Sequence, residues 1–159
     1  MVIILMGVAS SGKTTIGQLL AQQLDWPFFD ADEFHPPANI AKMSQGIALT
    51  DEDRWPWLAA IHRKSEELLA ADQSGVITCS ALKQIYRDRL TGEGVQFIYL
   101  KGTPEILIQR IRARTDHFMR PEMLASQLAA LEEPTGALIV DISPEPDDIV
   151  TTIRAALKL

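Results

Sequence analysis

The chain has 159 residues, of which 47% are hydrophobic and 23% are charged, and its formal net charge is -6. This composition is that of a globular protein, which excludes the disordered and fibrous classes, and the length predicts a single domain over residues 1–159. The negative charge and the lack of a Lys/Arg block argue against nucleic acid as a partner.

Targeting and membrane signals are weak throughout the sequence. The apolar run at the N-terminus is too short for a signal peptide and follows no basic segment, and no apolar stretch approaches the ~20 residues of a membrane-spanning helix. Cys79 is the single cysteine, so it cannot form an internal disulfide. We therefore expect a cytoplasmic protein with no membrane role.

Short apolar runs alternate with amphipathic segments from the N-terminus onward. Val2–Met6 is apolar throughout, which is typical of a strand buried on both faces. Apolar residues then recur at helical spacing and predict a helix over Lys13–Leu24. Phe28–Asp30 is a candidate second strand. The prolines at positions 36 and 37 argue against a continuous helix after it, so we expect a polar loop there.

The second half of the chain continues this alternation. Thr50, with Asp53 three residues later, is a helix N-cap pattern and predicts a long helix to about Ala71. Thr103 followed by Pro104 predicts another helix start. The remaining predicted elements are strands at 76–79, 95–100 and 137–142, and helices at 83–90, at 121–131 and from 143 onward. Together they predict an α/β fold, a five-stranded parallel sheet with helices on both faces.

The segment Gly7-Val8-Ala9-Ser10-Ser11-Gly12-Lys13-Thr14 matches the phosphate-loop pattern G-x-x-x-x-G-K-[ST] and lies between a predicted strand and a predicted helix. Its backbone N–H groups and the helix N-terminus should hold phosphate. We expect Lys13 to reach the β- and γ-phosphates, Thr14 to coordinate Mg²⁺, and Thr15 to assist. The alternative is a glycine turn with a chance Lys-Thr pair. No Asn-Lys-x-Asp guanine reader is present, which favours ATP.

Two aspartates follow the second predicted strand, where an open parallel sheet places its ligand crevice. We assign Asp32 to orienting or deprotonating the acceptor hydroxyl, because phosphoryl transfer needs an acidic residue at that point. Asp30 is then a candidate to hold a magnesium-bound water. The alternative, that both residues are acidic caps on a turn, remains open at this stage.

The stretch Arg110–Arg120 contains four arginines and one histidine with few large apolar residues, so it is a lid candidate. We assign Arg110 to ATP binding and Arg114 to neutralising charge on the transferred phosphoryl group. The alternative is a solvated basic helix end.

The phosphate loop occurs together with three more specific segments: Asp30-Ala31-Asp32-Glu33-Phe34-His35-Pro36, Asp51-Glu52-Asp53-Arg54 before Pro56-Trp57-Leu58, and Cys79-Ser80-Ala81-Leu82-Lys83. This combination closely resembles bacterial gluconokinases over nearly the whole chain. The resemblance implies transfer of the ATP γ-phosphate to the 6-hydroxyl of D-gluconate, a P-loop NTPase fold similar to nucleoside monophosphate kinases, and a homodimer.

The resemblance also implies roles for scattered cations, which otherwise are more often parts of solvated helix faces. Arg54, Lys83, Arg87 and His35 become candidates to bind gluconate, and His117 to meet it when the lid closes. Ala31 stands where the family usually has glycine, and alanine makes a left-handed backbone costly there. Many members also carry Ser-Gly where this chain has Ala9 and Ser10.

Two other functions fit the phosphate loop. One is a different small-molecule kinase, such as a shikimate-type enzyme, because phosphate-loop chemistry does not choose the acceptor. The other is a module that binds ATP without transferring phosphate.

Overall fold

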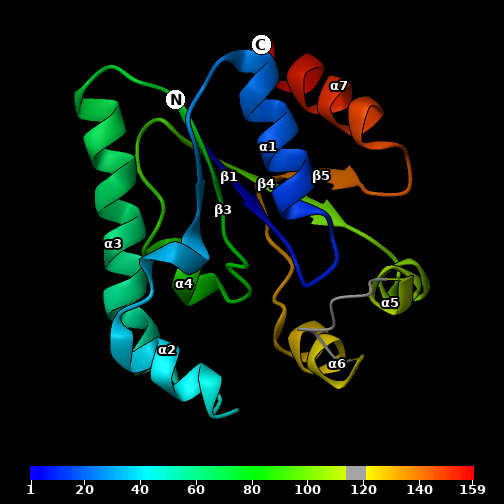
Figure 1. The fold of residues 1–159 in the computed structure, drawn as a ribbon. Coiled ribbons are helices and arrows are strands. Elements are labelled where there is room, and N and C mark those ends of the chain that lie inside the picture. The colour runs from blue at the N-terminus through cyan, green and yellow to red at the C-terminus, as the bar shows by residue number, and fades with distance from the viewer. Residues whose placement is uncertain (114–120) are drawn as a thin grey trace.

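A computed structural model describes residues 1–113 and 121–159, and its centre is a five-stranded parallel sheet with the strand order β2-β3-β1-β4-β5 (Figure 1). The strands are β1 (Val2–Met6), β2 (Phe28–Asp30), β3 (Gly75–Thr78), β4 (Val95–Lys101) and β5 (Leu138–Asp141). The helices are α1 (Lys13–Leu24), α2 (Pro37–Ser44), α3 (Asp51–Ala70), α4 (Gln84–Asp88), α5 (Pro104–Ala113), α6 (Pro121–Ala130) and α7 (Pro146–Leu157), with a 3-10 turn η1 (Ala31–Phe34) after β2. The predicted fold class is confirmed.

The central strand β1 divides the interior into two cores. Its side chains alternate between the faces of the sheet, as strand geometry requires. Ile3 and Leu5 join the core beneath α1, α5 and α7, whereas Val2, Ile4 and Met6 join the core beneath α3 and α4. All five residues have 0% exposure. The prediction of a strand buried on both faces is therefore confirmed.

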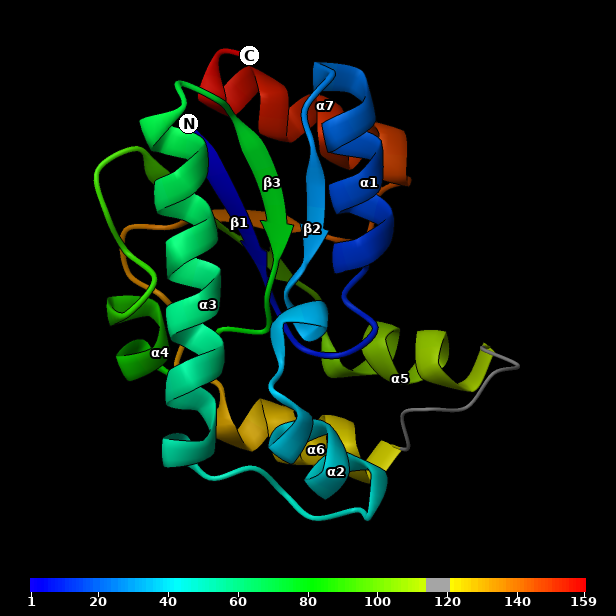
Figure 2. The ribbon, with the colours of Figure 1, turned by 60° about the vertical axis from the view of Figure 1, so that its left-hand side comes forward.

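Helices cover both faces of the sheet, as Figure 2 shows with α3 on one side and α1 and α7 on the other. The helix α3 begins with the predicted capping box, in which the Thr50 hydroxyl accepts from the Asp53 N–H and the Asp53 carboxylate accepts from the Thr50 N–H. No described helix is both long enough and apolar enough to span a bilayer.

Two predicted boundaries were wrong, both near prolines. The segment after β2 is not simply a loop, because α2 begins at Pro37, which occupies the first helical turn, where a missing N–H costs nothing. The side chain of Lys42 then pairs with Asp53 at 2.8 Å and anchors α2 to α3. The last helix starts at Pro146 rather than at Ser143, with Glu145 as its N-cap residue.

The lid candidate is only partly described, since Arg114, His117 and Arg120 lie outside the described residues. Its first part continues α5 to Ala113, and Ile111 is buried in the core at 3% exposure. This beginning of the stretch is therefore a packed helix end, contrary to the expectation that the whole stretch avoids the core.

Candidate active site

The phosphate loop connects β1 to α1 at the carboxyl edge of the sheet. Gly7 and Gly12 have φ angles of 153° and 89°, and a Cβ atom on Gly7 would lie 2.8 Å from the Ser11 hydroxyl. Only glycine can adopt this φ angle at position 7 and also leave room for the Ser11 hydroxyl. The α1 helix has no capping side chain and no acidic residue in its first turn. Its first N–H groups therefore remain available for an anion.

Ser10 also has a left-handed backbone, with φ at 61°. Its hydroxyl donates to the Leu107 carbonyl at 2.9 Å, which ties the loop to α5. Such a bond compensates part of the cost of a left-handed non-glycine residue. The chain thus keeps the phosphate-loop shape with a serine at the position where the family resemblance implies glycine.

Lys13 lies across the phosphate loop. Its ammonium group donates to the carbonyl oxygens of Gly7 at 2.9 Å and Val8 at 3.0 Å. These contacts hold the cation over the loop, where the β- and γ-phosphates of a nucleotide would bind. Thr14 and Thr15, at the start of α1, are exposed to solvent. The roles predicted for these three side chains stay predictions.

A hollow of about 320 Å³ lies beside the loop. It is lined by Ser10, Gly12, Thr15, Ile16, Arg110, Ala113, Pro144, Pro146 and Ile149. Arg110 donates to the Ile142 carbonyl at 2.7 Å, which holds its guanidinium at this wall. A mostly apolar hollow with one cation next to a phosphate loop suits the base and sugar of a nucleotide. ATP binding by Arg110 stays a prediction.

Asp30 ends β2, and Asp32 follows it in the turn η1. The Asp30 carboxylate accepts from the Asp32 N–H at 2.9 Å and caps the turn η1, so the cap interpretation holds for Asp30. Partial burial raises the pKa of the Asp32 carboxyl above 3.8, the nearby Asp30 raises it further, and Lys13 opposes the shift. Asp32 is thus close enough to Lys13 for the lysine charge to change its pKa. Ala31 is not among the residues with positive φ, so replacing glycine there costs no backbone strain.

A cluster of charged side chains lies where α3 meets α4, and we call Asp51, Arg54, Lys83 and Tyr86 the acceptor-side cluster. Lys83 donates to the Asp51 carboxylate at 3.1 Å, and the Tyr86 hydroxyl donates to the same oxygen. These two bonds, that of Tyr86 first, lower the pKa of Asp51. The Arg54 guanidinium lies over the Tyr86 ring, 5.4 Å from its centroid, and donates to the Leu49 carbonyl. The structure therefore brings Arg54 and Lys83 to the same tyrosine ring, and gluconate binding by either residue stays a prediction.

Arg87 is placed differently from the other predicted cations, because it is buried, with 3% exposure. Its guanidinium donates to the carbonyls of Ala81, Leu82 and Glu132 and to the side chain of Gln84. Burial lowers the pKa of the Arg87 guanidinium. Substrate binding by Arg87 stays a prediction, and its Nε is buried with no hydrogen-bond partner among the described residues.

His35 stacks on Trp57, with ring centroids 4.3 Å apart and planes at 11°. Its Nδ1 is 3.2 Å from the amide nitrogen of Asn39. Desolvation, followed by the charge of Arg54, lowers the pKa of His35, so the ring is neutral at pH 7. A neutral imidazole can donate one hydrogen bond to a hydroxyl oxygen but adds no charge for a carboxylate.

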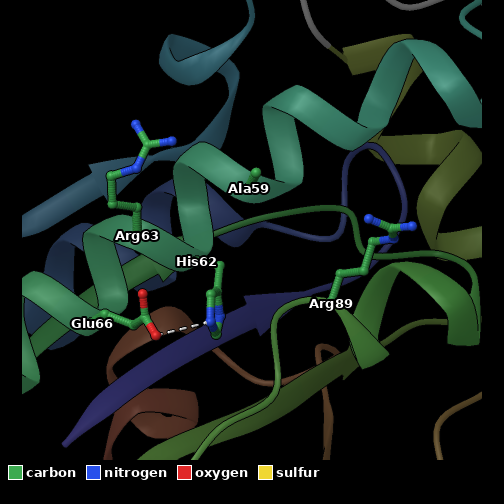
Figure 3. Close-up of a pocket in the computed structure, with 5 residues that line it drawn as sticks. All are labelled: Ala59, His62, Arg63, Glu66 and Arg89. Carbon is green, nitrogen blue, oxygen red and sulfur yellow. Dashed lines mark ion pairs between the residues drawn. The ribbon is translucent and has the colours of Figure 1, made fainter.

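A second hollow, of about 280 Å³, lies on α3 and is lined by Ala59, His62, Arg63, Glu66 and Arg89 (Figure 3). His62 pairs with Glu66 at 3.3 Å, and the Arg89 guanidinium lies 3.9 Å from the centre of the Trp55 ring. None of the predicted site residues lines this hollow. We therefore assign it no part in the chemistry.

Sequence reasoning missed three residues that the fold brings to the site. Asp51 accepts hydrogen bonds from both Lys83 and Tyr86, and Gln127 contacts the phosphate loop through the Ala9 N–H. Asp51 resembles an ordinary acidic residue in the first turn of a helix, and Tyr86 an ordinary core aromatic. The pairing of Gln127 with Ala9 spans 118 residues and leaves no local signal.

Comparisons with known proteins agree with this geometry. A family profile described as Shikimate kinase matches residues 9–142. The thermosensitive gluconokinase of Escherichia coli K12 is 47% identical over 160 residues, which cover 97% of this chain and 86% of the relative. The gluconokinase of Gluconobacter oxydans 621H is 45% identical over 134 residues, 83% of this chain and 75% of the relative.

A solved structure supports the same relationship. The crystal structure of a gluconokinase from Sinorhizobium meliloti 1021 has a TM-score of 0.87 and 43% identity, and the match covers 98% of this chain and 90% of that chain. The chain therefore belongs to the gluconokinase family, within the broader shikimate kinase group of P-loop kinases.

Proposed function

We propose that this protein transfers the γ-phosphoryl group of ATP to the 6-hydroxyl of D-gluconate, giving 6-phosphogluconate and ADP. The observation that supports the proposal is that Asp32 is near enough to Lys13 of the phosphate loop for the lysine charge to lower its pKa. The gluconokinase names of relatives more than 40% identical select the acceptor.

On the donor side, three kinds of group lie in or beside the phosphate loop. The backbone N–H groups at the start of α1 would bind phosphate oxygens, Lys13 would bridge the β- and γ-phosphates, and Arg110 borders the hollow for the nucleoside. Arg114 stays our candidate for the cation that neutralises charge on the transferred group. Such preorganised charges commonly supply most of the rate enhancement in phosphoryl transfer.

The residues beside Lys13 also fit Mg²⁺. The Thr14 hydroxyl and the Asp30 carboxylate are oxygen donors, which this ion prefers, and two protein ligands are typical because Mg²⁺ keeps several waters. Bound there, the ion would neutralise charge on the phosphates. Asp30 would act through a water, because its carboxylate already accepts from the Asp32 N–H at 2.9 Å.

Asp32 is the proposed acceptor-side base. Partial burial and the adjacent Asp30 raise its pKa, which makes the carboxylate a better proton acceptor than an ordinary aspartate. The charge of Lys13 opposes this rise in pKa and so favours the ionised carboxylate. Asp32 would orient the 6-hydroxyl and take its proton as the phosphoryl group transfers.

The other end of gluconate carries a carboxylate, which needs a cation. Arg54 and Lys83 of the acceptor-side cluster are both held by protein contacts, which lowers the cost of ordering them around a ligand. His35 is suited to a hydroxyl of the chain, and His117 stays a candidate for contact on closure. Arg87 stays a further candidate for binding gluconate.

Assembly and location follow from the resemblance alone. We propose a cytoplasmic homodimer. Light scattering coupled to size-exclusion chromatography would test the dimer, since a mass near 17.6 kDa would contradict it.

The test of the activity is to supply ATP, Mg²⁺ and D-gluconate and to detect 6-phosphogluconate. We expect turnover by the wild type and near loss in Asp32→Asn, which keeps the shape of the side chain without its basicity. Shikimate serves as the competing acceptor. Turnover of shikimate alone would favour the shikimate-type alternative, and ATP binding without any product would favour a binding module.

A further inference from the structure

Gln127 joins the helix α6 to the phosphate loop. Its side-chain oxygen Oε1 accepts from the Ala9 N–H at 2.7 Å. Figure 2 shows α6 beneath the loop that connects β1 to α1. Leu124, one turn earlier on the same helix, is buried in the core at 1% exposure, so the helix is a firm base for the contact.

The peptide unit that Gln127 holds is also the one that holds Lys13. The Ala9 N–H and the Val8 carbonyl belong to the same peptide group, and the Val8 oxygen accepts from the Lys13 ammonium at 3.0 Å. A trans peptide is planar, and its C=O and N–H point in opposite directions. Gln127 and Lys13 therefore hold the two ends of one rigid unit, and rotating that unit would break both bonds.

We propose that Gln127 is a positioning residue that sets the orientation of the Val8–Ala9 peptide and thereby the placement of Lys13. The inference deepens the proposed function, because it assumes that Lys13 serves the phosphates of ATP. A loop flanked by Gly7 and by the left-handed Ser10 has several accessible peptide orientations. Fixing one of them before ATP arrives lowers the ordering cost of binding.

The segment that follows α6 also contacts the acceptor side of the site. Just after α6, the Glu132 N–H donates to the Leu82 carbonyl at 2.8 Å, and the Glu132 carboxylate accepts from the Gln84 N–H at 2.7 Å. These bonds flank Lys83 in the sequence. One segment thus contacts the loop that would hold ATP and the turn that carries a gluconate-binding candidate.

Two variants separate this role from simple packing. Gln127→Leu keeps the bulk and the helix propensity but has no acceptor, and Gln127→Asn keeps the amide but is one methylene too short. We expect kcat/KM for ATP to fall about three- to tenfold in both, as for one lost hydrogen bond. The KM for gluconate should stay within about twofold. The matched control is Gln96→Leu, which changes an exposed residue near the start of β4 and should behave like the wild type.

Amide hydrogen exchange of Ala9 in the nucleotide-free protein reports the contact directly. We expect faster exchange in the Leu and Asn variants and slow exchange in Gln127→Glu, whose carboxylate still accepts the bond. Unchanged exchange in Gln127→Leu, or a Leu variant with the wild-type kcat/KM for ATP, would overturn the proposal. The ATP affinity of each variant, measured by calorimetry without gluconate, tests the role of Gln127 separately from the proposed activity. It does so because this measurement holds even if gluconate proves not to be the substrate.

Discussion

The phosphate loop and the acceptor-side cluster are built in different ways. The loop comes from one continuous segment between β1 and α1, and its groups are mainly backbone N–H and C=O with one lysine. The acceptor-side cluster gathers side chains from α3 and α4, and its Lys83–Asp51 bond joins residues 32 positions apart.

This difference separates the recognition of phosphate, which many nucleotide-binding proteins share, from the recognition of one particular acceptor. A backbone cradle recognises phosphate in any nucleotide and tolerates changes such as Ser10, because the shape of the loop matters more than its side chains. A side-chain cluster changes with each substitution, and it is therefore where related kinases can acquire different acceptors. Replacing the main cation of each region tests this division.

The largest effect should follow Lys13→Met. The variant removes the ammonium that spans the loop and keeps the length of the side chain. We expect kcat for gluconate phosphorylation to fall by about a thousandfold, as when a preorganised transition-state donor is lost. Steady-state assays with ATP and gluconate would measure it. Lys64→Met, which removes a half-buried lysine of α3 that pairs with Glu67, is the matched control and should keep full activity. A loss below tenfold would contradict the central role of Lys13.

Arg87→Met should produce the next effect, on folding rather than on chemistry. The variant leaves the carbonyls of Ala81 and Glu132 without the Arg87 donor, whereas the Leu82 carbonyl keeps its bond from the Glu132 N–H. We expect a loss of about 3 kcal/mol in the free energy of unfolding, measured by urea denaturation. Arg89→Met removes a more exposed guanidinium and should cost well under half as much. If Arg87→Met unfolded like the wild type but raised the KM for gluconate, Arg87 would be a substrate ligand as first predicted.

Arg87 also shows what sequence can and cannot provide. The phosphate loop, β1 and α1 were predicted to the residue, because each depends on a local pattern of apolar spacing and glycine placement. Whether a cation faces solvent, substrate or a buried carbonyl depends on segments far away in the sequence. The same holds for Gln127, whose partner is 118 residues distant. The helix α2 was missed because a proline can stop a helix or start one.

Lys83→Met should act on one substrate only. If Lys83 binds the gluconate carboxylate, losing a charge-assisted hydrogen bond should raise the KM for gluconate about ten- to fiftyfold. The KM for ATP should stay within about twofold, because the phosphate loop is built without this region. Equal increases for both substrates would contradict the division between the two regions. Asp51→Asn sharpens the test, since it leaves Lys83 charged but removes its carboxylate partner, and it should raise the KM for gluconate less than Lys83→Met does.

The smallest effect should be a gain in stability from Asp32→Asn, the same change that we expect to abolish turnover. Partial burial and Asp30 raise the pKa of Asp32 in the folded protein, so ionised Asp32 opposes folding at neutral pH. The folded protein binds more protons than the unfolded chain between the two pKa values, and stability therefore falls as pH rises through that window. The variant should be more stable at pH 7 by less than about 1 kcal/mol, because Asp32 keeps contact with solvent. The gain should disappear below the ordinary aspartate pKa. Urea denaturation at pH 7 and at pH 3.5 would measure both points, with Asp72→Asn, on an exposed turn, as the control. A destabilised variant at pH 7 would mean that Asp32 supports the fold and is not a strained group kept for its chemistry.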